Sequence, residues 1–347
     1  MQQIIYTNSI SEAVTSLVSG MAPATVHIIT DSNVADKVLP SLGLPYHVIV
    51  TPPGDTAKNL DTLSHIWTEL INAGATRKSV VINIGGGVVT DMGGFAAATF
   101  KRGIRFINVP TTLLSAVDAA VGGKTGINFN GYKNEIGAFA PADAVVISTA
   151  TFATLPVEEL RSGYAEMLKH GLLSSADDYA ELLGFDITRA DLDRLLPLLE
   201  KSVRVKERIV EEDPREQGIR RALNLGHTAG HAFESLALER NAPVPHGYAV
   251  AWGMLVEMIL SNFAEQFPSS ELYRYAAYLK EQGYGSPAIT CDDYARLLTL
   301  MSHDKKNDTP DRINFTLLSR PGEPLIDRTA STQAITQALD IFRDMIE

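Results

Sequence analysis

The sequence predicts an α/β N-terminal domain with a mostly parallel, Rossmann-like sheet, followed by a mostly α-helical C-terminal domain. Short apolar runs such as 26–30 and 80–84 alternate with helical segments in the first part of the chain, a pattern typical of a parallel sheet covered on both faces. After Pro156 strand signals become rare and helical periodicity dominates. Since 347 residues are many for one hydrophobic core, we expect two domains, 1–150 and 151–347.

The expected elements follow in order along the chain. Residues 2–6 have the composition of a strand, and Ser9-Ile-Ser-Glu12 has the pattern of a capping box, which predicts a helix to about Gly20. A second helix is expected at 59–73, where Gly74 ends it. Buried-type strands are predicted at 26–30, 46–50, 80–84, 106–109 and 144–147, with 315–318 as a late exception in the helical part.

Composition excludes several classes of protein. The net charge of −11 argues against nucleic acid as the main partner. Cys291 is the single cysteine, so an internal disulfide and a Cys-rich metal site are excluded, and a reducing cytoplasm is expected. We find neither a signal-peptide pattern at the start nor an uninterrupted apolar run of membrane-spanning length, so no membrane association is expected.

A glycine turn follows the predicted strand 80–84 and opens a helix. Backbone amides of Gly86 and Gly87 could approach a pyrophosphate at the helix N-terminus. The match to a dinucleotide fingerprint is imperfect, because Thr90 takes the third glycine position and the expected later acidic residue is missing. A tight turn without a ligand therefore stays open. Thr111 ends the next strand at the same predicted edge, which favours a ligand.

A lysine-rich segment occupies residues 115–139. Its Gly-Gly-Lys-Thr run is not a P-loop, because Asp118 stands where the first glycine is required. We expect a glycine-flanked loop that presents Lys124, Lys133 and Asn134 to an anionic ligand.

Three histidines and one carboxylate suggest an open Zn²⁺ site built from separate helices. His227 and His231 are four residues apart, so helical spacing alone pairs them as ligands. His246 opens another apolar helix, and Glu166 shares a helix face with Lys169. We expect Gly226 and Gly230 to leave room for a ligand on that helix face. Hydrogen-bonded core histidines are the alternative.

Several long motifs occur in an order that resembles the 3-dehydroquinate synthase family of the sugar phosphate cyclase superfamily. They are Pro-Gly-Asp55-x-x-Lys58, Gly-Gly-Gly-Val-Val-x-Asp91, Pro-Thr-Thr112, Val-Asp118-x-x-Val-Gly-Gly-Lys124-Thr-Gly-Ile-Asn128, Lys133-Asn134-x-Ile-Gly, Gly-x-Ala-Glu166-x-x-Lys169 and Leu-Asn224-x-Gly-His227-Thr-x-Gly-His231-Ala. The resemblance implies conversion of 3-deoxy-D-arabino-heptulosonate 7-phosphate to 3-dehydroquinate and phosphate, a step of the shikimate pathway. Transient oxidation by NAD, phosphate elimination, re-reduction and an aldol closure would accomplish it.

The resemblance also implies roles for individual residues. It makes Glu166, His227 and His246 the ligands of a divalent metal, Zn²⁺ or Co²⁺, and places His231 beside the substrate. The other residues expected to act in catalysis are Lys169, Asp118, Lys124, Asn224 and Lys206. Those expected to bind substrate are Arg102, Asn134, Arg220 and one of Lys305 and Lys306. Those expected around NAD are Asp31, Asp55, Lys58, Gly86, Gly87, Asp91, Thr111, Thr112, Lys133, Thr154, Leu155 and Glu159.

The sequence departs from the family where Thr90 replaces the usual glycine, and packing beneath the pyrophosphate is expected to differ there. The segment beginning at Ser319 also differs, outside the site motifs. By analogy with the family we expect a cytoplasmic homodimer.

Two other enzymes fit part of the pattern: another sugar phosphate cyclase, and a metal-dependent alcohol or glycerol dehydrogenase. Arg220 argues against the first, because simple sugar phosphates lack a carboxylate for it to bind, and the cations as a set argue against the second. A non-catalytic binding protein of the same fold is a third alternative.

Overall fold

The computed structural model describes residues 2–130, 132–302 and 313–346. The chain forms two compact units. Unit 1 contains Met1–Pro156 and Asp191–Val203, and unit 2 contains Val157–Ala190 and Arg204–Glu347. The sequence changes character at the same proline that ends the first part of unit 1.

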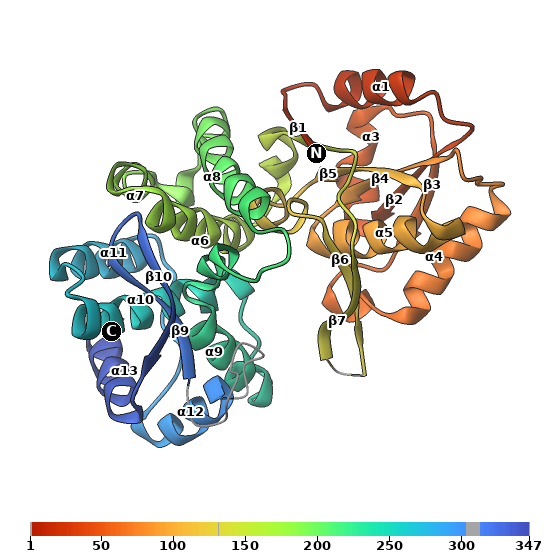
Figure 1. The fold of residues 1–347 in the computed structure, drawn as a ribbon. Helices are drawn as coiled ribbons and strands as arrows, with labels where there is room; N and C mark the ends of the chain where they lie inside the picture. The colour runs from red at the N-terminus through yellow and green to blue at the C-terminus, as the bar shows by residue number, and fades with distance from the viewer. Residues whose placement is uncertain (1, 131, 303–312, 347) are drawn as a thin grey trace. The chain divides into compact units, whose positions relative to one another are not determined.

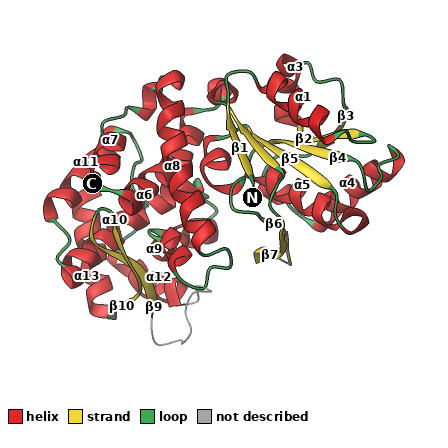
Figure 2. Ribbon diagram, turned by 45° about the horizontal axis from the view of Figure 1, so that its top comes forward, coloured by secondary structure: helices red, strands yellow, loops and turns green. Residues whose placement is uncertain are grey.

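Unit 1 is built on a six-stranded parallel sheet with the order β1-β8-β5-β4-β2-β3 (Figures 1 and 2). The strands are β1 (Gln3–Tyr6), β2 (Val26–Asp31), β3 (His47–Thr51), β4 (Val80–Gly85), β5 (Arg105–Pro110) and β8 (Ala144–Ile147). After β2 the chain builds outward to β3 and then returns to the other side of β2 with β4. The direction of winding therefore reverses between β2 and β4, where open α/β sheets bind ligands. The predicted parallel sheet is confirmed.

Helices cover both faces of this sheet, and alternate strand residues supply the two cores. Ile29 of β2 packs with one core, together with α4 and α5, and Ile28 packs with the other, together with α1 and α2. The helices of unit 1 are α1 (Ile10–Met21), α2 (Ser32–Lys37), α3 (Leu39–Leu42), α4 (Leu60–Asn72) and α5 (Gly87–Thr99). The capping box predicted at Ser9 is wrong, because the Ser9 side chain makes no capping hydrogen bond.

The later part of the lysine-rich segment, from Lys124 to Phe139, forms a β-hairpin, which corrects the predicted loop. Strands β6 (Lys124–Phe129) and β7 (Tyr132–Phe139) pair antiparallel. Gly126 and Gly137 lie opposite each other, and a Cβ at Gly137 would come within 2.2 Å of the Thr125 carbonyl oxygen. These glycines therefore permit close strand pairing. Because many residues of these strands are charged or exposed, the alternation of apolar and polar residues that predicts a strand is absent.

Unit 2 is mostly helical, as predicted. Its helices are α6 (Val157–Ser174), α7 (Ala176–Leu183), α9 (His227–Glu239), α10 (His246–Glu265), α11 (Ser269–Glu281), α12 (Tyr294–Ser302) and α13 (Thr332–Ile346), while α8 (Leu192–Glu212) begins in unit 1 and ends in unit 2. Helix α10 forms the centre of the unit. It is long and apolar enough to cross a membrane, but 83% of its apolar stretch is buried inside the protein, as in the core helix of a soluble domain.

One hairpin interrupts the helices of unit 2. Strands β9 (Ile313–Arg320) and β10 (Glu323–Ala330) pair antiparallel. The first contains the predicted strand at 315–318. The second was not predicted, because its burial is partial and its charged residues break the apolar pattern.

Candidate active site

Three side chains from three helices of unit 2 converge. Glu166 lies in the middle of α6, while His227 and His246 are the first residues of α9 and α10. Glu166 Oε1 lies 3.7 Å from His227 Nε2 and 3.9 Å from His246 Nε2. One ligand atom from each residue falls within 4.8 Å of the others. This spacing is close enough for a single cation to contact all three.

The outer nitrogens of both imidazoles are held in place. His227 Nδ1 lies 3.1 Å from the Leu225 carbonyl oxygen, which can only accept a hydrogen bond, so the proton resides on Nδ1. His246 Nδ1 lies 3.1 Å from Glu234 Oε2. Both arrangements leave an Nε2 lone pair directed at Glu166, the geometry in which metal-binding histidines are fixed by outer partners. Glu234 was not predicted, although it follows His227 by seven residues and so lies on the same helix face.

Glu166 fits a metal ligand by its own surroundings. Its side chain is fully buried, and neither carboxylate oxygen has a hydrogen bond from the described residues. Oε2 is compensated by an ion pair with Lys169, but a buried Oε1 without a hydrogen bond is costly, and a cation bound to it would remove that cost. One carboxylate with two neutral imidazoles matches a catalytic zinc site, which keeps a position open for substrate.

Lys169 places a positive charge beside Glu166. It follows by three residues on α6, is also buried, and forms an ion pair with Glu166 Oε2. The carboxylate therefore has one oxygen directed at an ammonium group and the other directed at the two imidazoles.

His231 is adjacent to this group but outside it. Its ring centroid lies 5.3 Å from that of His227 and 6.0 Å from that of His246. The cluster of ligand atoms that unit 2 presents contains His246 in place of His231. Helical spacing alone pairs His227 with His231, because such spacing takes no account of side chains from other helices, whereas the group of close ligand atoms joins His227 to Glu166 and His246.

The glycines of this region serve helix packing, which corrects their predicted role beside a ligand. A Cβ at Gly226 would lie 2.4 Å from Met254 Cγ, and one at Gly230 would lie 2.9 Å from the Ala249 carbonyl oxygen. From the opposite helix, a Cβ at Gly253 would lie 2.0 Å from the Gly226 carbonyl oxygen. These glycines let the backbones of α9 and α10 touch.

The segment between α8 and α9, which contains the 3₁₀ helix Ile219–Asn224, presents further polar groups. Asp213 accepts hydrogen bonds from the backbone N–H groups of Gln217, Gly218 and Arg220, and these bonds hold the pKa of Asp213 below its usual range. Arg220 is buried and donates to the Pro214 carbonyl oxygen over 2.8 Å. Asn224 Nδ2 donates to Glu216 over 3.2 Å.

Three further lysines that were expected to act on or bind the substrate belong to unit 2. Lys206 is buried near the end of α8. Lys305 and Lys306 lie outside the described residues.

In unit 1, most residues expected around NAD follow the carboxyl ends of parallel strands. Asp31 ends β2 and caps α2, accepting from Asn33 and Val34. The others at this edge are Asp55 and Lys58 after β3, Gly86 and Gly87 after β4, Thr111 and Thr112 after β5, and Thr154 and Leu155 after β8. Because these strands are parallel, all of these residues lie at one edge of the sheet.

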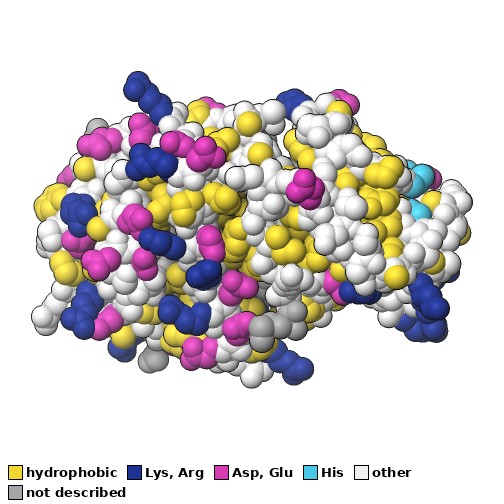
Figure 3. Space-filling model, turned by 90° about the horizontal axis from the view of Figure 1, so that it is seen from above, with side chains coloured by type: hydrophobic (Ala, Val, Ile, Leu, Met, Phe, Trp, Pro, Cys, Tyr) yellow, Lys and Arg dark blue, Asp and Glu magenta, His cyan; other side chains and the backbone are white. Residues whose placement is uncertain are grey.

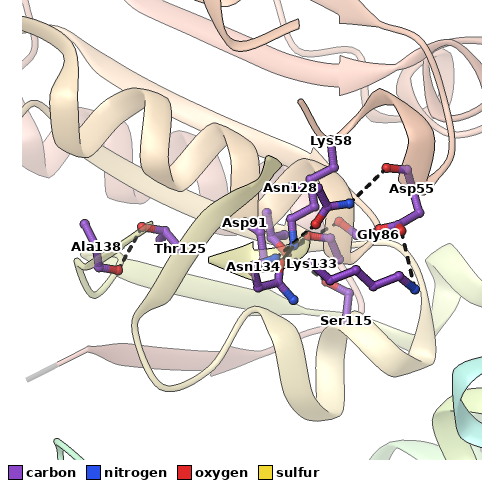
Figure 4. A network of polar contacts seen from close by, with 12 residues as sticks. Asp55, Lys58, Gly86, Asp91, Ser115, Thr125, Asn128, Lys133, Asn134 and Ala138 are labelled. Carbon is purple, nitrogen blue, oxygen red and sulfur yellow. Dashed lines mark hydrogen bonds and ion pairs between the residues drawn. The ribbon is translucent and has the colours of Figure 1, made fainter. Parts of the chain in front are cut away.

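Lys58, which follows β3 at this edge, connects the edge to α5 and to β7 (Figure 4). Its buried ammonium group donates to Asp91 Oδ2 on α5 over 2.6 Å and to Asn134 Oδ1 on β7. Lys133 Nζ forms a more exposed ion pair with Asp55 Oδ2 at 3.5 Å. The β6–β7 hairpin is thus anchored to the strand ends by side chains that the family resemblance placed around NAD, and by Asn134, which it placed beside the substrate.

The glycine turn packs closely against its neighbours. Gly86 precedes α5, and a Cβ there would lie 3.2 Å from Thr112 Cγ2. Thr90 is buried, and its hydroxyl lies 3.2 Å from the Gly87 carbonyl oxygen and 3.3 Å from Ser115 Oγ. Its side chain thus bonds within the turn and the adjoining segment.

The remaining predicted residues lie at scattered positions within their units. In unit 1, Arg102 is exposed at the end of the 3₁₀ helix Phe100–Arg102, Asp118 is partly buried in the π-helix Ser115–Ala119, and Lys124 is exposed at the start of β6. In unit 2, Glu159 is exposed in the first turn of α6.

Family models match most of the chain. A model of the 3-dehydroquinate synthase N-terminal domain matches residues 48–162, and one of the C-terminal domain matches residues 163–307. The chain is 46% identical to the 3-dehydroquinate synthase of Parabacteroides distasonis, over 99% of this chain and 98% of that protein. It is 38% identical to the enzyme of Halalkalibacterium halodurans, over 94% and 91%.

A solved structure shares the fold. The 2-deoxy-scyllo-inosose synthase complexed with carbaglucose-6-phosphate, NAD⁺ and Co²⁺ has a TM-score of 0.86 at 24% identity, covering 98% of this chain and 96% of that one. The two family models and the identity over nearly the full length lead to one conclusion. The chain belongs to the 3-dehydroquinate synthase family.

Proposed function

We propose that this protein converts 3-deoxy-D-arabino-heptulosonate 7-phosphate to 3-dehydroquinate and inorganic phosphate, the reaction of its family. The observation that carries the proposal is the convergence of Glu166, His227 and His246, whose facing atoms lie within 4.8 Å. These three residues would hold a divalent cation, Zn²⁺ or Co²⁺. The edge of the unit 1 sheet would hold NAD⁺.

The two bound groups would supply complementary chemistry. Bound NAD⁺ offers a reversible hydride acceptor, and the cation offers a Lewis acid that lowers the pKa of adjacent hydroxyls. Lys169 holds an ammonium group at the carboxylate of Glu166, where it would stabilise developing negative charge on the substrate. Asn224 and Asp118 would orient hydroxyl groups, and His231 would assist proton movement at the phosphate.

Cations would hold the two anionic ends of the substrate. We propose that three cations, Lys124, Lys206 and Arg102, bind the phosphate and nearby oxygens together with the neutral amide of Asn134. Arg220 would bind the carboxylate. Because the Arg220 guanidinium is buried, an anion that reaches it would gain a strong, oriented interaction. This residue favours a sugar acid over a simple sugar phosphate, the substrate type of the rival cyclase.

A turnover assay tests the proposal directly. Purified protein is incubated with the heptulosonate phosphate, NAD⁺ and Zn²⁺, while phosphate and NADH are both measured. We expect phosphate release without net NADH accumulation, since the hydride is returned. Steady NADH accumulation would instead support the dehydrogenase alternative, and phosphate release from glucose 6-phosphate alone would support another cyclase.

Arg220→Met adds a specificity test, with Arg221→Met as its control. Arg221 is the next residue, is half-exposed and pairs with Asp327. We expect the Arg220 variant to raise KM for the sugar acid and the Arg221 variant to leave it unchanged. Equal effects would refute the assignment of the carboxylate to Arg220.

We further propose that residues 1–150 bind NAD and residues 151–347 bind the metal and most of the substrate. A cytoplasmic homodimer that binds neither nucleic acid nor membrane is proposed from the family and the charge. Acidic and basic side chains are interspersed over the left part of the view in Figure 3, and the right part is mostly apolar or uncharged, so this face has no broad basic surface for nucleic acid.

A further inference from the structure

Glu257 is a buried carboxylate with no role in the proposed reaction. It lies on α10, is fully buried, and accepts three hydrogen bonds from backbone N–H groups at the start of α9. Glu257 Oε2 lies 2.6 Å from the nitrogen of Gly226, and Oε1 lies 3.1 Å from that of Thr228 and 3.3 Å from that of Ala229. These amides flank His227 on both sides.

Helix α9 has no side-chain cap of its own. Its N-cap position is Gly226, with φ of +81°, which has no side chain to accept from the first turn. Free N–H groups at a buried helix start are unfavourable, and a negative charge there is favoured by the helix dipole. Glu257 therefore supplies from a neighbouring helix the cap that α9 lacks.

The two helices run antiparallel and are joined at both ends. Gly226 meets Met254, and Gly230 meets Ala249 further along the pair. At the far end Glu234 of α9 meets His246 of α10. Glu257 thus fixes one end of the helix pair, and the Glu234–His246 contact fixes the other.

We propose that Glu257 is a positioning residue that sets where His227 stands relative to Glu166 and His246. The inference rests on the proposed function of those three as metal ligands. His227 is the first residue of α9, so a shift or fraying of that turn moves its imidazole directly. The carboxylate fixes the first turn, and the Leu225 carbonyl then fixes the ring.

Glu257→Gln tests the proposal. It keeps the size of the side chain but replaces one acceptor oxygen with an NH₂ group that faces N–H donors. We expect Zn²⁺ and Co²⁺ to bind roughly ten-fold more weakly or worse. We also expect an altered visible spectrum of bound Co²⁺, because the ligand geometry changes. Glu257→Asp keeps the charge with a shorter reach and should bind metal with intermediate affinity.

Ser261→Ala is the matched control. Ser261 lies one turn further on α10, is buried, donates to the Glu257 carbonyl oxygen over 2.6 Å and accepts from the Leu318 nitrogen over 3.0 Å. The variant loses buried hydrogen bonds of the same helix without touching α9. We expect a lower melting temperature with an unchanged metal dissociation constant and Co²⁺ spectrum.

These measurements distinguish failure of the positioning role of Glu257 from failure of the proposed metal site. Wild-type metal affinity and Co²⁺ spectrum in Glu257→Gln would overturn the positioning role, as would an equal loss of affinity in Ser261→Ala. Should Glu257→Gln fail to fold, Glu257→Asp decides by the same two readouts. Glu166→Gln is measured in parallel, and unchanged metal binding in that variant would reject the metal site instead.

Discussion

Replacing Glu166 with glutamine should lower stability and metal binding together. Without its carboxylate partner, the buried Lys169 ammonium is left uncompensated, and breaking a buried ion pair in this way costs about 3–5 kcal/mol. An exposed pair of the same spacing gives the contrast. Glu271 and Arg274 on α11 are also three residues apart but partly exposed, so Glu271→Gln should cost under about 0.5 kcal/mol.

The two variants should also differ in how much Zn²⁺ stabilises them. At a Zn²⁺ concentration 100 times its dissociation constant, a folded protein gains about 2.7 kcal/mol of stability. Wild type and Glu271→Gln should both show this gain. Glu166→Gln loses one of three ligands and should gain much less.

Tryptophan fluorescence during urea unfolding measures both effects. Trp252 lies on α10 in unit 2, and the other tryptophan, Trp67, lies in unit 1. In a Trp67→Phe background the signal therefore reports unit 2. Unfolding is followed with Zn²⁺ and with a chelator. An equal Zn²⁺ gain in Glu166→Gln and wild type, or a loss in chelator no larger than that of Glu271→Gln, would refute the reasoning.

Three further predictions follow. Glu234→Gln should weaken Zn²⁺ binding about 10- to 100-fold in a metal titration, because Glu234 fixes the His246 ring. Gly253→Ala should prevent close packing of α9 on α10 and largely abolish soluble expression, because its Cβ would lie 2.0 Å from a carbonyl oxygen. His27→Gln should reduce the loss of stability between pH 7.5 and 5.5. Burial and then the neighbouring His47 lower the pKa of His27 from 6.5, so the unfolded chain binds more protons and stability falls as pH drops below about 6.5.

Each of these three predictions would be contradicted by a specific measurement. Wild-type Zn²⁺ affinity in Glu234→Gln would remove the outer-partner role. A well-folded Gly253→Ala protein with unchanged melting temperature would contradict the helix contact. For His27, denaturant unfolding at both pH values gives the slope, which a single proton limits to about 1.4 kcal/mol per pH unit. An unchanged slope in the variant would contradict the buried neutral imidazole.

The sequence predicted the sheet well because its strands are buried on both faces. The run Val80–Ile84 is apolar except for Asn83 and is fully buried, and the glycines that follow mark its end. The β6–β7 hairpin was missed for the opposite reason. Most of β7 is exposed, and its sequence, which includes Lys133, Asn134, Glu135 and Gly137, has no period-two pattern of apolar residues. A strand can therefore be predicted from local sequence only where burial of one face makes apolar residues alternate with polar ones, or burial of both faces makes the whole run apolar.

The candidate site was only partly predictable from local spacing. Spacing on one helix suggested His227 with His231, whereas the nearest facing atoms belong to Glu166 and His246 on other helices. The family resemblance supplied that combination, because residues 61 and 80 positions apart leave no local signal. Glu257 was not predicted either, since its partners are backbone amides, which every residue has.

The central claim is that one cation binds Glu166, His227 and His246 together. Anomalous diffraction at the zinc absorption edge, from crystals grown with Zn²⁺, measures this directly. We expect a peak about 2.0–2.2 Å from Glu166 Oε1 and from the Nε2 atoms of His227 and His246. A zinc peak held elsewhere, or one that uses His231 in place of His246, would contradict it.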